Sequence, residues 1–329
     1  MRKMIEEEIR PEALFDELLR LNRGDIEEYF TSSSYRNINC PACGERGRFS
    51  FNKDGFNFDE CPSCKTLYVS PRPDKASFDQ YYTDSESTKF WATTFYKATQ
   101  KNRREMLWKP KAKLIDQTLE KFSQDTEMIV DIGGGYGVFM EEFLKIRALD
   151  HLVIEPSNYL SQICREKGLN VKQKFLEDIE RHEFCTSKKV YVSFELFEHL
   201  HDPKAFLQTL ERLMQKGDLF IFTTLSGMGV DIQTLWEDSK AISPPMHLNF
   251  FNPKSVTILL ENLGFKVLEV TTPGKLDINI MENNIAQVKD RFWRNFIEAS
   301  NDEEKADMQK FIAENRLSSH MMITCQKVL

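Results

Sequence analysis

The stretch that decides the fold is MIVDIGGGYG, residues 128–137. A short apolar run with one acidic member leads directly into four glycines within five positions. Glycine has no Cβ, so a strand that ends in such a turn lets backbone amides approach a ligand closely. A helix is expected from Val138 onward. The stretch therefore predicts the first strand of a nucleotide-binding α/β domain.

Two carboxylates decide which nucleotide fits this loop. Asp131 stands at the end of the predicted strand, where it would repel a pyrophosphate but suits the cationic amino group of S-adenosylmethionine (SAM). Glu155 ends a second apolar run 24 residues later, a position from which one carboxylate reaches two ribose hydroxyls. The third glycine of a dinucleotide fingerprint is also missing, because Val138 takes its place. The alternative reads Asp131 as a helix cap and Glu155 as a surface carboxylate.

Apolar runs and helical stretches alternate on the carboxyl side of the glycine loop. Further strands are expected near residues 151–155, 171–174, 188–194, 218–224 and 266–272, and a last one at 320–326 follows a charged helical stretch at 282–316. This rhythm predicts a doubly wound, Rossmann-like α/β sheet. Upstream, residues 5–30 predict amphipathic helices that break near Asn22-Arg23-Gly24.

Four of the seven cysteines form two tight pairs, Cys40 with Cys43 and Cys61 with Cys64. Two such pairs separated by 17 residues supply the four thiolates of a tetrahedral zinc ribbon. Four thiolates leave no open coordination position, so the expected Zn²⁺ is structural. A redox role is the alternative. The remaining cysteines are expected to be reduced core thiols: Cys164, Cys185 and Cys325.

A chain of 329 residues is long enough for a core domain and a smaller module. We expect N-terminal helices at 1–37, the zinc ribbon at 38–73, a helical cap at 74–125 and a SAM-binding domain at 126–329. The net charge of -7 disfavours a nucleic-acid partner. The N-terminus turns acidic at once without the apolar run of a signal peptide, and no stretch suits a membrane span, so a cytoplasmic location is expected.

Candidates for the chemistry follow the predicted strand at 188–194. Glu195, Glu198 and His199 stand at i, i+3 and i+4, which would place them on one face if the segment were helical. His199 could act as a general base, or the three could hold a divalent cation such as Mg²⁺ that acidifies an acceptor hydroxyl. A purely structural capping role is the alternative. His247, after the Pro244-Pro245 turn, is a second candidate base.

Taken together, these motifs resemble the class I SAM-dependent methyltransferases, in particular a branch with an N-terminal zinc ribbon. The matching stretches follow one another in order: the cysteine pairs, residues 67–73, Tyr81-Tyr82, 131–137, 155–157, 198–203, 247–251 and 263–265. The Glu-x-x-Glu-His spacing at 195–199 is similar to that of ubiquinone O-methyltransferases. The resemblance implies a seven-stranded methyltransferase sheet.

The resemblance also implies roles for individual residues. Asp131, Gly133 and Gly135 would line the methionine end of SAM, and Glu155 would hold the ribose. Asp178 would contact the adenine amino group, unless it is a surface acid that opens a helix.

Members of this branch look like sugar or polyketide methyltransferases, which implies a small-molecule or carbohydrate acceptor and favours O-methylation. Relatives that C-methylate nucleotide sugars carry an additional C-terminal domain that this chain is too short to hold.

Two rival functions are compatible with the same motifs. The zinc ribbon could serve recognition in an RNA or protein methyltransferase, for which Arg46, Arg48 and Arg72 offer a modest basic supply. A regulatory protein that binds SAM without catalysis would keep the glycine loop but lack a competent acceptor pocket. An oxidoreductase that uses NAD is disfavoured by the glycine pattern. The oligomeric state is left open by the sequence.

Overall fold

The computed structural model describes residues 5–184 and 187–328, which form two compact units. The first unit contains Met1–Lys101, Leu225–Val256 and Thr271–Met321; the second contains Asn102–Thr224, Thr257–Val270 and Met322–Leu329. Each unit is therefore assembled from three separate segments, which differs from the continuous division expected from the sequence. The difference arises because strand pairing joins segments that are far apart in the chain. Cys185 lies outside the described residues.

The second unit is built on a seven-stranded sheet with the order β12-β13-β10-β9-β6-β7-β8. The five strands from β8 to β10 are parallel neighbours. Numbered along the chain, the seven strands run 3-2-1-4-5-7-6 across the sheet, so the doubly wound prediction is confirmed. The order reverses between β6 and β9, which is the point where open α/β sheets bind ligands. The strands are β6 Met128–Ile132, β7 Asp150–Ile154, β8 Val171–Lys172, β9 Lys189–Phe194, β10 Leu219–Leu225, β12 Phe265–Thr271 and β13 His320–Lys327.

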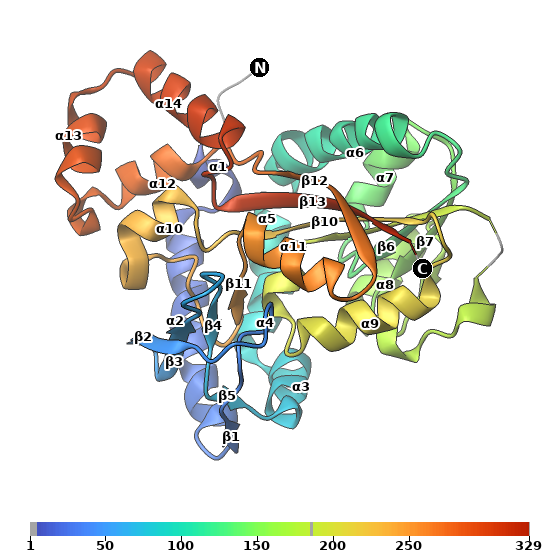
Figure 1. The fold of residues 1–329 in the computed structure, drawn as a ribbon, viewed down its shortest axis with the longest axis horizontal. Helices are drawn as coiled ribbons and strands as arrows, with labels where there is room; N and C mark the ends of the chain where they lie inside the picture. The colour runs from blue at the N-terminus through green and yellow to red at the C-terminus, as the bar shows by residue number, and fades with distance from the viewer. Residues whose placement is uncertain (1–4, 185–186, 329) are drawn as a thin grey trace. The chain divides into compact units, whose positions relative to one another are not determined.

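Helices cover both faces of this sheet, with α6 and α7 on one side and α9 on the other (Figure 1). α6 (Lys109–Phe122), α7 (Val138–Leu144) and α8 (Asn158–Glu166) pack on one face in a core that includes Ile129, Val153 and Val190. On the opposite face, Phe206 of α9 (Pro203–Leu213) lies 6.4 Å from Phe220 between ring centroids. Burial on both faces explains why these strands read as continuous apolar runs.

The first unit contains the cysteine pairs within a four-stranded sheet of order β11-β4-β3-β2. The Phe-rich stretch at 48–58 is a hairpin, because Asp54 and Gly55 both take positive φ angles, 48° and 85°, between β2 and β3. β11 comes from far along the chain and pairs antiparallel with β4. The strands are β2 Arg48–Lys53, β3 Phe56–Glu60, β4 Leu67–Val69 and β11 Asn249–Phe250, and a separate pair joins β1 Tyr35–Arg36 to β5 Arg72–Pro73.

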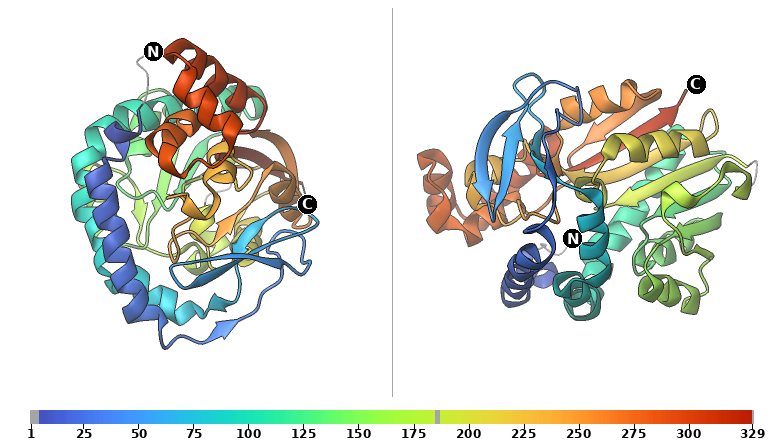
Figure 2. Two further views of the ribbon diagram at one scale, coloured as in Figure 1. Left: turned by 90° about the vertical axis from the view of Figure 1, so that its left-hand side faces the viewer. Right: turned by 90° about the horizontal axis from the view of Figure 1, so that it is seen from below.

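The expected helix break near Asn22 is wrong, because α2 runs without interruption over Glu12–Phe30 (Figure 2, left). Buried Asn22 donates a hydrogen bond to the Pro244 carbonyl at 2.7 Å and accepts one from Tyr81 Oη at 2.8 Å. Asp25 accepts the backbone N–H of Ser87 at 2.9 Å. These tertiary hydrogen bonds outweigh the weak local break signal of one glycine. The only break in this region falls at Arg10-Pro11, after α1 (Glu6–Ile9).

The remaining helices of the first unit complete its core. The helical stretch predicted at 282–316 is confirmed, and with the start of α12 it forms three helices around buried Met281, Ile297 and Ile312. The stretch before residue 125 is helical as predicted, and it includes two π-helical turns, Trp91–Phe95 and Arg104–Trp108. The helices are α3 Lys75–Asp84, α4 Glu86–Phe90, α5 Tyr96–Arg103, α10 Val230–Leu235, α12 Asp277–Asn283, α13 Arg291–Ala299 and α14 Asp302–Glu314. A further helix, α11 (Pro253–Glu261), begins in the first unit and lies mostly in the second.

In the part of the chain that the structure describes, no helix combines the length and the apolar character that crossing a membrane requires.

Candidate cofactor site and cysteine centre

The glycine loop leaves β6 in left-handed backbone conformations. Gly133, Gly135 and Gly137 have φ angles of 71°, 56° and 66°, a region that other residues enter only with strain. The loop is anchored by its own amides, since Gly133 N–H donates to the Ile154 carbonyl at 2.8 Å. A buried thiol, Cys164, donates to the Gly135 carbonyl at 3.2 Å from α8. Contacts with β7 and α8 therefore hold the loop in this conformation.

Asp131 is buried at the carboxyl end of β6, with 2% of its surface exposed. Burial is the main reason that its pKa rises to about 7, the charge of Glu155 raises it further, and Lys111 lowers it. A buried carboxyl with this environment favours a cationic group as its partner, because pairing would restore the charged form.

Glu155 follows β7 directly and is 6% exposed. Its Oε2 accepts the backbone N–H of Gly135 at 2.9 Å, and its Oε1 accepts that of Ser157 at 2.9 Å. Burial raises the pKa of Glu155, and these two N–H donors oppose the rise. Glu155 therefore ties the glycine loop to the start of α8, where Ser157 is the N-cap.

Asp178 is the third carboxylate predicted to contact the cofactor, and unlike Asp131 and Glu155 it is not buried. Asp178 is an exposed residue in the 3-10 turn Leu176–Asp178 that follows β8. Its backbone N–H donates to Phe175 O at 3.2 Å. Its role toward a cofactor stays a prediction.

The segment after β9 is not an α-helix, so the condition for a shared helical face of Glu195, Glu198 and His199 is not met. A short 3-10 turn covers Phe197–His199 alone, and Glu195 precedes it with a φ angle of 52°. Glu195 combines this left-handed conformation with a carboxylate that contacts other partners: Thr223 Oγ1 donates to Oε1 at 2.7 Å, and Lys111 Nζ lies 3.1 Å from the same oxygen. The carboxylate of Glu195 therefore has partners other than Glu198 and His199.

Glu198 is 2% exposed and accepts a hydrogen bond from Thr224 Oγ1 at 3.0 Å. Burial raises its pKa to about 8, with a contribution from the charge of Glu195. Burial thus disfavours the charged form of Glu198, whereas Glu195 is paired with a cation. Two neighbouring carboxyls with opposite environments are a pattern found at acid–base sites.

The two candidate bases lie in different units. His199 is half-buried at the end of the 3-10 turn in the second unit, and its backbone N–H donates to Leu196 O at 3.0 Å. His247 belongs to the first unit, where its Nδ1 lies 2.6 Å from the Ala241 carbonyl and its ring packs edge-on against Phe250. A carbonyl only accepts, so Nδ1 carries the hydrogen and Nε2 is the basic nitrogen of His247.

Three residues of this region were missed by sequence reasoning: Lys111, Thr223 and Thr224. The threonines end β10 beside β9, and a polar pair at the end of an apolar run is a signal that could have found them. Lys111 lies 84 positions before Glu195. No local sequence pattern identifies Lys111 as a residue of this site.

The four paired cysteines converge in the first unit. Cys40 Sγ lies 3.5 Å from Cys64 Sγ, Cys43 Sγ lies 3.5 Å from Cys61 Sγ, and all four sulfurs are within 4.8 Å of one another. Gly44 and Lys65, which follow the two pairs, have φ angles of 79° and 60°, so each pair closes with the same turn. A tetrahedral zinc with Zn–S bonds of about 2.3 Å would hold its sulfurs about 3.8 Å apart. The cluster fits that geometry.

A segment from far along the chain supports this centre. Buried Asn252 donates its side-chain amide to the Cys64 carbonyl at 2.8 Å, and Arg72 donates to Asn249 Oδ1 at 2.8 Å. The cysteine module is therefore integrated into the first unit through β11 and the residues after it.

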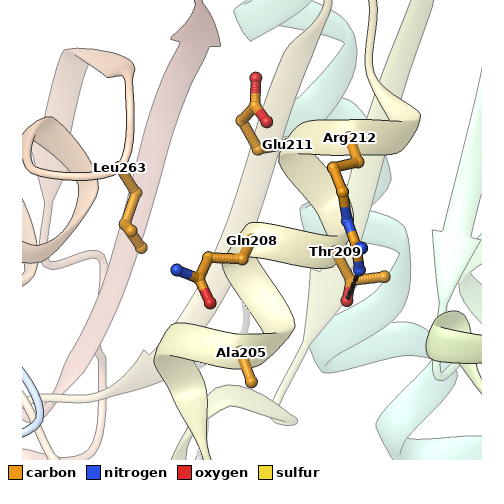
Figure 3. A pocket seen from close by; sticks show the side chains of 6 residues that line it. All are labelled: Ala205, Gln208, Thr209, Glu211, Arg212 and Leu263. Carbon is orange, nitrogen blue, oxygen red and sulfur yellow. Dashed lines mark hydrogen bonds between the residues drawn. The ribbon is translucent and has the colours of Figure 1, made fainter.

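A separate surface pocket of about 440 Å³ opens beside α9 (Figure 3). Its walls are mostly polar, and Arg212 donates to Thr209 Oγ1 at 3.1 Å within it. Its lining residues are Ala205, Gln208, Thr209, Glu211, Arg212 and Leu263. None of them belongs to the set predicted for cofactor binding or catalysis, so the pocket is distinct from the candidate site.

Comparison with known proteins identifies the family. A family model described as a methyltransferase domain matches residues 100–270, just over half of the chain. The chain belongs to this family. Residues 100–270 therefore form a methyltransferase domain, and the resemblance to class I SAM-dependent methyltransferases and the Rossmann-like fold predicted from the sequence are confirmed.

Two curated relatives of this methyltransferase are ubiquinone biosynthesis O-methyltransferases. The protein of Colwellia psychrerythraea is 29% identical over 103 residues, which cover 30% of this chain and 42% of the relative. The protein of Actinobacillus pleuropneumoniae is 25% identical over 107 residues, covering 30% of this chain and 45% of the relative. This chain thus spans less than half the length of either relative.

Among solved structures, a chain of the complex containing the Haloferax volcanii Trm112 methyltransferase activator matches this methyltransferase. The TM-score is 0.50 at 14% identity, over 76% of this chain and 97% of that chain. At this identity the similarity shows the fold alone.

Proposed function

We propose that this methyltransferase transfers the methyl group of SAM to a hydroxyl of a small-molecule or sugar-type acceptor. The observation that carries the proposal is the placement of acid–base groups at the switch point of the sheet. Asp131 ends β6, and Glu198 and His199 follow β9, its direct neighbour. A hydroxyl needs a base to become a nucleophile, and this segment supplies one beside the strand that leads into the glycine loop.

In the proposed site, Asp131, Gly133 and Gly135 hold the methionine end of SAM. Asp131 fits this role because its carboxyl is buried and its pKa is about 7, so pairing with a cationic group would favour its charged form. Glu155 is proposed to hold the ribose, and Asp178 the adenine amino group. Glu155 already accepts hydrogen bonds from two backbone N–H groups, and these fix the orientation of its carboxylate before the ribose hydroxyls bind.

The bound SAM supplies an electrophilic methyl on a sulfonium. We propose that His199 takes the proton of the acceptor hydroxyl while the new O–CH₃ bond forms and the S–CH₃ bond breaks. S-adenosylhomocysteine (SAH) leaves with the electron pair of that bond, so charge and atoms balance. Glu198, held by Thr224, would orient the turn that presents His199. His247 remains the second proposed base.

The alternative route uses a divalent cation, such as Mg²⁺, to acidify the hydroxyl. Glu198 and His199 offer an oxygen and a nitrogen ligand, whereas Glu195 is engaged by Lys111 and Thr223. The ion pair of Glu195 favours the base mechanism, because one of the three expected ligands is already neutralised.

The curated relatives support oxygen as the methylated atom, since both are O-methyltransferases that match part of this chain. The net charge of -7 supports a small acceptor over RNA, whose phosphates would be repelled. The test is incubation with SAM and separate panels of phenols, sugars, amines, peptides and RNA, read by mass spectrometry. We expect a single added methyl group on hydroxyl compounds. Methylation confined to RNA or to proteins would overturn the proposal and favour recognition by the ribbon.

We further propose that the cysteine centre holds one structural Zn²⁺ through Cys40, Cys43, Cys61 and Cys64. We expect one zinc per chain in protein purified without added metal. Elemental mass spectrometry measures this zinc content. Cys61→Ser should lose the metal and lower the thermal midpoint, because three ligands hold zinc far less well than four. Cys325→Ser, a change at a buried cysteine outside the cluster, is the control and should retain full zinc content. Purified wild type without zinc would contradict this proposal.

A further inference from the structure

Lys167, the residue at the carboxyl end of α8, contacts the glycine loop directly. Its Nζ donates to the Tyr136 carbonyl at 2.7 Å and to Glu141 Oε2, in the first turn of α7, at 2.8 Å. The side chain is mostly enclosed, with 18% of it exposed. Two short contacts from an ionised donor fix the position of the ammonium group. Lys167 therefore holds a backbone atom of the loop in addition to forming an ion pair.

The glycine loop lies directly against the end of α8. A Cβ at Gly137 would lie 2.5 Å from Leu169 Cδ1 and 2.9 Å from Cys164 Sγ, which is closer than side-chain atoms can approach. The Cys164 thiol also donates to the Gly135 carbonyl at 3.2 Å. Two consecutive carbonyls of the loop, those of Gly135 and Tyr136, thus receive donors from the same end of one helix.

The lysine contact also sets the direction of the next amide in the loop. The peptide bond between Tyr136 and Gly137 is trans, so its C=O and N–H groups point in opposite directions. Holding the Tyr136 carbonyl therefore also holds the Gly137 N–H, which donates to the Gly134 carbonyl at 2.9 Å. That hydrogen bond closes the turn in which Gly135 and Gly137 take positive φ angles. A loop that is already ordered loses less conformational freedom when a ligand binds, which favours affinity.

We propose that Lys167 is a positioning residue that fixes the glycine loop in its binding conformation through the Tyr136 carbonyl and thereby raises the affinity for SAM. The inference rests on the proposed assignment of the glycine loop to the cofactor. The contact with the loop carries this effect, and the ion pair with Glu141 does not. The charge of the lysine matters because a hydrogen bond from an ionised donor is stronger than one between neutral groups.

The experiment measures SAH affinity by calorimetry for the wild type, Lys167→Met and Lys167→Arg. We expect Lys167→Met to bind SAH about three- to tenfold more weakly, the range expected for the loss of one hydrogen bond. Lys167→Arg keeps a charged donor and should recover most of the affinity. With an acceptor found in the panel, Lys167→Met should raise the KM for SAM by a similar factor and leave kcat close to that of the wild type.

Two further variants separate the loop contact from the ion pairs on α7. Lys145→Met is the matched control, because Lys145 is 62% exposed and pairs with Glu142 of α7 at 2.7 Å. It should bind SAH like the wild type. Glu141→Gln removes the ion pair of Lys167 and leaves the Tyr136 carbonyl in place, so it should keep most of the wild-type affinity. A Glu141→Gln protein as weak as Lys167→Met would assign the effect to the ion pair and overturn the inference.

Hydrogen exchange of residues 133–137 reads the order of the loop itself. The N–H groups of Gly133, Gly135 and Gly137 all donate hydrogen bonds, so they exchange slowly while the loop keeps its conformation. Without ligand, we expect faster exchange in Lys167→Met than in the wild type or Lys145→Met, and saturating SAH should remove the difference.

Unchanged SAH affinity or unchanged loop exchange in the Lys167→Met protein would overturn the inference. Wild type that binds no SAH would instead reject the cofactor site on which the inference rests. The two failures are therefore distinguishable.

Discussion

Replacing His199 with alanine is expected to lower methyl transfer by about 10²- to 10⁴-fold while SAM affinity stays close to that of the wild type. The reason is that His199 follows β9 and is proposed to act on the acceptor hydroxyl, whereas the groups proposed for the cofactor lie at the ends of β6 and β7 and after β8. Turnover is measured with an acceptor found in the panel, and SAM affinity by calorimetry. The combination of lost turnover and kept affinity separates a base from a residue that shapes the cofactor site.

His201→Ala is the control for this change, because His201 is a half-buried histidine two positions further on. If Glu198 and His199 hold a cation, chelation should cause a similar loss in the wild type, and added magnesium should reverse it. Zinc content must be unchanged during that treatment. Full activity in both the His199→Ala and the His247→Ala proteins would exclude base catalysis by either residue and leave alignment of the reactants as the mechanism.

Asp131→Ala and Glu155→Ala are each expected to weaken SAM binding by roughly 10- to 150-fold. The estimate follows from losing a charged hydrogen-bond partner, which costs about 1.5–3 kcal/mol. Glu155→Ala should also lower the thermal midpoint without ligand, because the amides of Gly135 and Ser157 lose their acceptor. Calorimetry and thermal unfolding measure the two effects.

Glu127→Ala is the matched control for these carboxylates, since Glu127 is exposed and precedes β6 at its amino end. It should leave the affinity unchanged. Unaltered SAM binding in both the Asp131 and the Glu155 variants would reject the assigned pocket.

The sheet could be predicted from the sequence because its strands are buried on both faces and so carry a strong local signal. The runs at β6, β9 and β10 are mostly apolar, and the structure buries all of their residues except Leu225. The cysteine cluster could equally be predicted from the sequence, because a tight turn brings the two cysteines of each pair together without a contact from a distant segment. Cys164 and Cys325 are buried thiols, as expected.

What could not be predicted depends on contacts between distant segments. β11 joins the cysteine module through the pairing of Asn249 with Tyr68, and two residues are too short a strand to give a pattern. The continuity of α2 is decided by Asn22 and Asp25, whose partners lie far along the chain. The shape of the segment after β9 was left open by the sequence for the same reason, since Glu195, in its left-handed conformation, contacts Lys111 and Thr223 from distant parts of the chain.

The most direct test of the central claim is a calorimetric titration of the wild type with SAH, followed by one with NAD. A SAM-dependent methyltransferase with one glycine loop per chain should bind one SAH per chain and give no binding heat with NAD. Binding of NAD, or no binding of SAH at a pH where Asp131 is ionised, would contradict the account.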